Sequence, residues 1–152
     1  MDKAMLDIMN EILKHEWTGV AQYSQAGFVV SGVWREVYSP MFLGSAEESF
    51  GHAKKIGEKI VALGGVPSVE RNQVHQSNDL TEMLKAGLEF ESKAVNLYQE
   101  ALEMADGKNR PLVILLEEIL LEEQEGVDHL TLILNDQNTS SGIAGGAASK
   151  VG

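Results

Sequence analysis

The sequence contains no cysteine, which excludes disulfide bonds, thiolate metal sites and thiol catalysis. It has no apolar run of the length needed to span a membrane, and its charged N-terminal segment has no apolar signal region, so we expect a cytoplasmic protein without a membrane partner. Basic side chains are scarce, with 12 against 23 acidic ones and a formal charge of −11. This balance repels nucleic acid and attracts cations, so we expect no nucleic-acid partner.

Glycine and proline divide the chain into helical stretches in which apolar residues recur at helical spacing. Ser39-Pro40 has the form of a helix start, with serine as the cap and proline in the first turn, and Asn78-Asp79 supplies capping residues for another helix. No strand pattern is evident. The expected helices cover about 2–31, 37–63, 79–105 and 111–134.

The lengths of the connections predict the topology. Short breaks near 32–36 and 106–110 favour two antiparallel hairpins, and the connection over 64–78 is long enough to run the length of a bundle. We therefore expect an all-α four-helix bundle over 1–135, made of two antiparallel hairpins joined by one long crossover. The remainder, 136–152, is rich in Gly, Ser and Ala and is predicted to be a flexible tail.

An ionisable side chain interrupts each apolar stripe near its middle: Glu16, His52, Glu91 and Glu123. A lone buried carboxylate costs several kcal/mol unless it is paired or binds a metal, so four such residues at similar depth suggest a shared cation. Oxygen and imidazole ligands suit iron, manganese or zinc. The EEQE sequence at 122–125 leaves open whether Glu122 or Glu123 points inward. His15 and His75 are expected on the surface.

Four segments resemble bacterioferritin in their order and approximate spacing: HEWTGVAQY (15–23), HAKKIGEKIVALGGVP (52–67), ESKAVNLYQEALEMAD (91–106) and EEILLEEQEGVDHL (117–130). The resemblance extends to about Leu134. It implies a ferritin-like subunit of a homo-oligomeric iron-storage shell, a 12-mer or 24-mer, that oxidises Fe(II) to Fe(III) at a di-iron site within each bundle. That site takes one Glu from each of two helices and a Glu-x-x-His pair from each of the other two.

Carried over by position, Glu16 and Glu91 match the two single carboxylates, while His52 and Glu123 each match one member of a pair. The other members are replaced by Ser49 and Gly126, so two of the six expected ligands are missing. The remaining set implies a weakened centre for one or two irons. The methionine that binds haem in bacterioferritins corresponds to Phe50, which cannot ligate, so haem is not expected.

Three further residues are candidates to replace the missing ligands. Glu48 precedes His52 by four residues and Glu125 precedes His129 by four, and such pairs share a helix face. The alternative is that both glutamates are solvated or line the shell interior, and that His129 lies in the core or an interface.

The sequence thus predicts an iron-binding, iron-storage subunit with a weakened or modified ferroxidase site, working alone or beside a related, catalytically intact subunit. Whether it still oxidises iron is open. The alternative is a non-catalytic structural or accessory bundle that has lost its metal.

Overall fold

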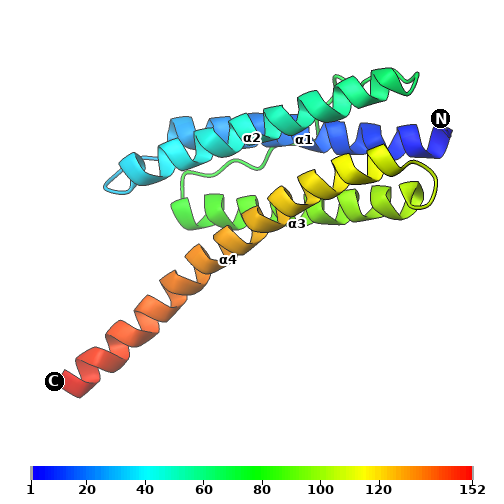
Figure 1. The fold of residues 1–152 in the computed structure, drawn as a ribbon. Coiled ribbons are helices and arrows are strands. Elements are labelled where there is room, and N and C mark those ends of the chain that lie inside the picture. The colour runs from blue at the N-terminus through cyan, green and yellow to red at the C-terminus, as the bar shows by residue number, and fades with distance from the viewer. Residues whose placement is uncertain (1, 152) are drawn as a thin grey trace.

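The computed structural model describes residues 2–151, with side chains over residues 2–135. Within that part the chain forms helices without strands: α1 (Lys3–Val29), α2 (Arg35–Ala62), α3 (Leu80–Ala105) and α4 (Arg110–Val151). α1 and α2 form one antiparallel hairpin, α3 and α4 form the other, and α1 packs against α3 (Figure 1). A single long crossover joins the hairpins, which confirms the predicted topology.

The C-terminal part of the chain differs from the prediction in one respect and leaves another untested. α4 is assigned through Val151, past the expected end near Leu134. The flexible tail predicted over 136–152 falls outside the residues whose side chains are described, so it stays a prediction.

The helix ends follow from local chemistry. Asp79 caps α3, because its Oδ2 accepts a hydrogen bond from the Glu82 amide at 2.9 Å, as the sequence suggested. Gly32 and Gly107 lie in the two hairpin turns with φ of 86° and 71°. Residues with a Cβ resist this left-handed backbone, so glycine allows the chain to reverse there.

The predicted start of α2 at Ser39-Pro40 is wrong, because α2 already begins at Arg35 and Pro40 lies inside the helix. The Arg35 guanidinium donates to the carbonyl oxygens of Phe28 and Val30 at 3.0 and 2.6 Å, which satisfies the open end of α1 and fixes the turn. Ser39 does not cap α2, since its hydroxyl donates to the Gly27 carbonyl at 2.7 Å.

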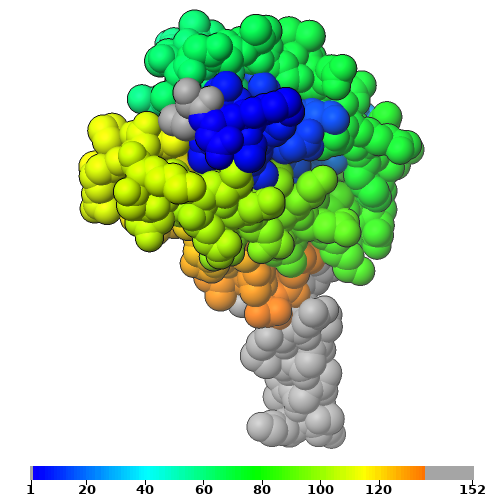
Figure 2. Space-filling view, turned by 90° about the vertical axis from the view of Figure 1, so that its right-hand side faces the viewer, coloured from blue at the N-terminus to red at the C-terminus, as the bar shows by residue number. Residues whose placement is uncertain are grey.

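The crossover runs along α1 and is attached to it by side chains. The Asn10 side chain bonds the backbone of Val66 and Ser68, and the Trp17 indole donates to Ser68 O at 3.1 Å. Further along, the oxygens of the Thr18 and Gln22 side chains accept from crossover amides at 2.8 and 3.0 Å. Figure 2 shows the end of the bundle where the first turns of α1 lie between the α2–crossover segment and the α3–α4 segment. One polar face of α1 therefore fixes the path of the crossover.

Among the side chains of residues 2–135, the apolar core consists of two clusters. One includes Met9, Ile12 and Leu116, and the other includes Phe42 and Phe90. The buried glutamates and histidines belong to neither cluster. The fold thus provides a polar layer within an otherwise apolar interior. Among the described residues no helix is long and apolar enough to cross a bilayer.

Candidate metal centre

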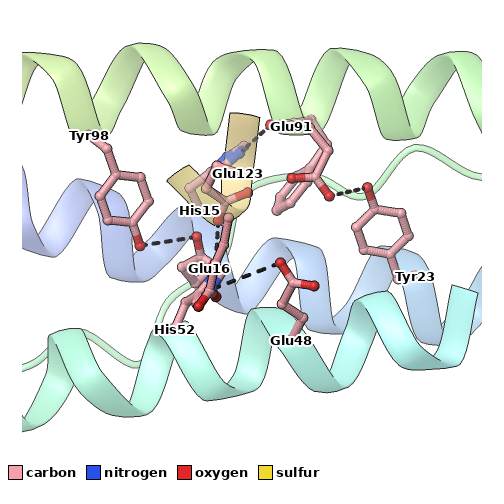
Figure 3. Close-up of polar contacts among 10 residues, drawn as sticks. His15, Glu16, Tyr23, Glu48, His52, Glu91, Tyr98 and Glu123 are labelled. Carbon is pink, nitrogen blue, oxygen red and sulfur yellow. Dashed lines mark hydrogen bonds and ion pairs between the residues drawn. The ribbon is translucent and has the colours of Figure 1, made fainter. Parts of the chain in front are cut away.

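Each helix contributes one buried glutamate or histidine to a cluster in the bundle interior (Figure 3). Glu16 from α1, His52 from α2, Glu91 from α3 and Glu123 from α4 are each at most 8% exposed. The helical period of 3.6 residues places each of them on the inward stripe of its helix. The sequence left open whether Glu122 or Glu123 points inward, and Glu123 is the buried one.

His52 lies at the centre of the cluster and faces a different set of carboxylates with each ring nitrogen. Its Nδ1 is 2.8 Å from Glu123 Oε1 and 3.5 Å from Glu16 Oε2. Its Nε2 is 2.6 Å from Glu122 Oε2 and 3.9 Å from Glu48 Oε1. Glutamate, histidine and glutamate atoms within 4.8 Å of one another therefore occur on both sides of the ring, as metal sites require.

Glu122 is a contact that the predicted ligand set missed. The sequence suggested it as an alternative to Glu123 or as an entry carboxylate, and in the structure both Glu122 and Glu123 reach His52. Consecutive residues on a helix point about 100° apart, so they can contact one ring from two sides only when that ring lies between their directions. The acidic run at 122–125 was a signal, but the position of the α2 ring decides which residues use it.

Two buried tyrosines donate to the carboxylates in a reciprocal pattern. Tyr23 of α1 donates to Glu91 of α3 at 2.7 Å, and Tyr98 of α3 donates to Glu16 of α1 at 3.2 Å. Each tyrosine follows the glutamate of its own helix by seven residues, and α1 and α3 run in opposite directions. Two helical turns therefore bring each hydroxyl level with the carboxylate of the other helix.

The burial of several charges in one place shifts their proton affinities. Burial, together with the hydrogen bond and charge of Glu123, raises the pKa of Glu91 to about 9. Burial and the charge of Glu16 raise the pKa of Glu123 to about 7. Burial acts to lower the pKa of His52, but the hydrogen bond with Glu123 and the nearby carboxylate of Glu16 outweigh it and raise the value to about 11. In the metal-free site the imidazolium is thus the counter-ion of the carboxylates.

One oxygen of the cluster remains unsatisfied. Glu16 is fully buried, and its Oε2 has no hydrogen-bond partner, alone among the buried side-chain nitrogens and oxygens of the described residues. Burying a polar atom without a hydrogen-bond partner costs about 1–3 kcal/mol, and more when the group is charged. The presence of such an atom in the folded protein therefore needs an explanation. A cation beside Glu16 Oε2, Glu123 Oε1 and His52 Nδ1 would satisfy it, and this donor set fits iron.

A pocket of about 450 Å³ leads to the centre between α2, α3 and α4. Glu48, Glu91, Glu122, Glu125 and His129 line it together with smaller or apolar residues. Glu48 is about half exposed and stands at the outer nitrogen of His52. The structure places Glu125 and His129 at the pocket wall rather than in the buried cluster. His129 is exposed, so it does not lie in the core of the bundle, and its place in an interface stays a prediction.

The positions that the resemblance would fill with ligands are closely packed. The Ser49 hydroxyl lies 2.5 Å from where a Cβ on Gly19 would stand, so it faces α1. A Cβ on Gly126 would lie 3.0 Å from Glu91 Cδ. The Glu91 carboxyl therefore occupies the space in front of Gly126.

His15 was expected on the surface, and this expectation is wrong, whereas His75 is exposed as predicted. The His15 ring is 4% exposed, stacks on Phe90 at a centroid distance of 4.0 Å and donates from Nε2 to the Phe90 carbonyl at 2.9 Å. Burial lowers its pKa to about 4, so the ring is neutral at pH 7.

Comparison with known sequences relates the chain to a bacterial ferritin and a bacterioferritin. A bacterial ferritin from Neisseria meningitidis serogroup B is 28% identical over 109 residues, which cover 69% of this chain and 68% of the relative. A bacterioferritin from Streptomyces coelicolor is 26% identical over 132 residues, which cover 85% of this chain and 78% of the relative.

Solved structures agree with the sequence comparison. A ferritin-like, diiron-carboxylate protein from Bacillus anthracis superposes with a TM-score of 0.85 at 30% identity, covering 88% of this chain and 99% of the other. A dodecameric thioferritin, the bacterioferritin-related protein of Bacteroides fragilis, also gives 0.85 at 28% identity, covering 93% and 90%. Residues 6–139 match the family of the ferritin-like domain. With four helices, one long crossover and a central layer of carboxylates, this chain belongs to the ferritin-like family.

Proposed function

We propose that this chain is an iron-binding and iron-storage subunit whose buried centre binds Fe(II) with Glu16, His52 and Glu123, and with Glu91 beside them. The unsatisfied Oε2 of Glu16, fully buried and 3.5 Å from His52 Nδ1, is the observation that supports this most directly. Iron here is substrate and cargo. The diiron-carboxylate structure from Bacillus anthracis supports the choice of metal.

The same centre supports only weak ferroxidase activity. Rapid oxidation requires two Fe(II) ions held close together, each giving one electron to a shared oxidant such as dioxygen. One imidazole, with Ser49 and Gly126 where the resemblance expects ligands, holds one iron firmly and a second one loosely. We therefore expect iron binding to be retained and oxidation to be slow.

The storage role requires a closed shell. The related dodecameric protein of Bacteroides fragilis supports a homo-oligomer, a 12-mer or 24-mer, formed alone or together with a related subunit. Large exposed apolar side chains near the α1–α2 turn, namely Phe28, Val33, Trp34 and Val37, offer surface for subunit contacts. Native mass spectrometry of the purified protein measures the assembly.

The first experiment is an anaerobic Fe(II) titration followed by exposure to air, monitored by the near-ultraviolet absorbance of Fe(III)-oxo species. The double variant Glu16→Ala/Glu91→Ala serves as the control. Fe(II) binding that this variant loses, with slow oxidation in the wild type, supports the proposal. Rapid oxidation that the variant loses would contradict the weakened centre.

A second candidate is a structural or accessory bundle without metal. The contacts of protonated His52 with Glu122 and Glu123 favour it, because they supply a built-in positive charge among the carboxylates. The two candidates differ in the iron content of protein purified from iron-rich medium. Absence of bound iron, together with no binding in the titration, would establish the structural role.

A further inference from the structure

The two ring nitrogens of His52 face different carboxylates, and those beside Nε2, Glu48 and Glu122, line the pocket. The inner position is formed by Nδ1 with Glu16 and Glu123, and the outer position by Nε2 with Glu48 and Glu122. The outer carboxylates are about half exposed, whereas the inner ones are at most 3% exposed. The ring thus separates a solvent-facing set of ligands from a closed one.

The pocket in front of the outer position is lined by acidic side chains. Four glutamates line it, of which Glu91 holds a proton, and no lysine or arginine occurs among its described lining residues. The unsatisfied, fully buried Oε2 of Glu16 lies behind the ring. A cation that enters from the pocket therefore meets Glu48 and Glu122 first and Glu16 Oε2 last.

A neutral imidazole has one lone pair and one N–H, so one ring cannot serve both positions at once. With a cation at Nε2, the Nδ1–H donates to Glu123 over the existing 2.8 Å contact. With a cation at Nδ1, the Nε2–H donates to Glu122 over the existing 2.6 Å contact. Both tautomers are satisfied without movement of the ring, and transfer inward shifts one ring proton from Nδ1 to Nε2.

We propose that Glu48, Glu122 and His52 Nε2 form an outer cation position that loads divalent metal into the buried position at His52 Nδ1, the two being filled in turn. This inference rests on metal binding at the inner position as the proposed function. The outer carboxylates accordingly determine the rate of loading, and the inner ones determine the final occupancy.

The test follows Co(II) binding to the assembled full-length protein by stopped-flow visible absorbance, because the Co(II) bands report its coordination. Glu48→Gln/Glu122→Gln is compared with Glu47→Gln/Glu118→Gln, which makes the same charge change on exposed positions of the same helices outside the pocket. Glu16→Gln tests the inner position separately.

We expect loading in the outer variant to slow about tenfold or more, with final Co(II) occupancy unchanged, while its matched control changes by less than about twofold. Equal rates in the two variants would overturn the outer position. Loss of final Co(II) occupancy in the outer variant would mean that Glu48 and Glu122 are permanent ligands of the bound metal. That result would overturn the proposal that the two positions are filled one after the other. No Co(II) binding by the wild type, or binding unaffected by Glu16→Gln, would instead refute the inner site and with it the proposed function.

Discussion

Metal binding at the inner position should release protons, because the metal-free centre holds them where a cation has to bind. The pKa of His52 is about 11, since its hydrogen bond with Glu123 and the nearby carboxylate of Glu16 outweigh the effect of burial. Burial and the neighbouring Glu123 raise the pKa of Glu91 to about 9. At pH 8 the imidazolium must lose one proton to expose a lone pair, and Glu91 must lose one to become a ligand.

The cost of this proton release follows from the two pKa values. One pKa unit is worth ~1.4 kcal/mol, so at pH 8 deprotonation costs about 4 kcal/mol at His52 and about 1 kcal/mol at Glu91. The free site binds more protons than the metal-bound site, so raising the pH favours binding. Near pH 8 the apparent Kd for Co(II) should therefore fall about a hundredfold per pH unit, as release of about two protons requires.

Isothermal titration calorimetry with Co(II) at pH 8 checks this prediction. The binding enthalpy is measured in several buffers, and its slope against the ionisation enthalpy of the buffer gives the number of protons released. The wild type should release about two and Glu91→Gln about one. Release of no protons, or the same number from both proteins, would refute the assignment of protons to His52 and Glu91.

Three other perturbations test particular contacts. Burial lowers the pKa of His15 to about 4, so its neutral form stabilises the fold above about pH 6.5. About 3 kcal/mol of the free energy of unfolding is lost as the pH falls towards 4. In urea denaturation, His15→Phe should remove that part of the pH dependence. Tyr98→Phe removes the hydrogen bond to Glu16 Oε1 and leaves only the 3.5 Å contact of Oε2 with His52, so thermal or urea unfolding should show a loss of about 1–3 kcal/mol that Co(II) partly restores. Gly126→Ala places a Cβ 3.0 Å from Glu91 Cδ and should weaken Co(II) binding, whereas Gly44→Ala, with open space around it, should stabilise by about 0.5–1 kcal/mol and leave binding unchanged.

The sequence predicted the features that depend on one helix at a time. The apolar period identified the four helices, and the interruption of each stripe identified Glu16, His52, Glu91 and Glu123 as buried. The lengths of the breaks predicted the two hairpins and the crossover, because a short connection forces neighbours to be antiparallel.

Features that depend on how one helix is placed against another could not be read in this way. The hydrogen bond from Tyr98 to Glu16 and the contact of Glu122 with His52 require the offset and rotation between two helices, which no single stripe contains. The prediction that His15 lies on the surface was wrong for the same reason, because the ring that covers its imidazole belongs to Phe90 on α3. The early start of α2 depends on Arg35 reaching back to α1, which local capping rules do not include.

The reciprocal tyrosine–glutamate bonds have a consequence for how the two hairpins hold together. The α1–α2 hairpin contributes Glu16, Tyr23 and His52, and the α3–α4 hairpin contributes Glu91, Tyr98 and Glu123, so neither contains a complete ligand set or a satisfied carboxylate alone. A cation bound to residues of both hairpins therefore links the two halves of the molecule, and it stabilises their association by an amount that grows with the logarithm of the free metal concentration above its Kd. Loaded protein should resist separation of its halves far more than it resists fraying within either half.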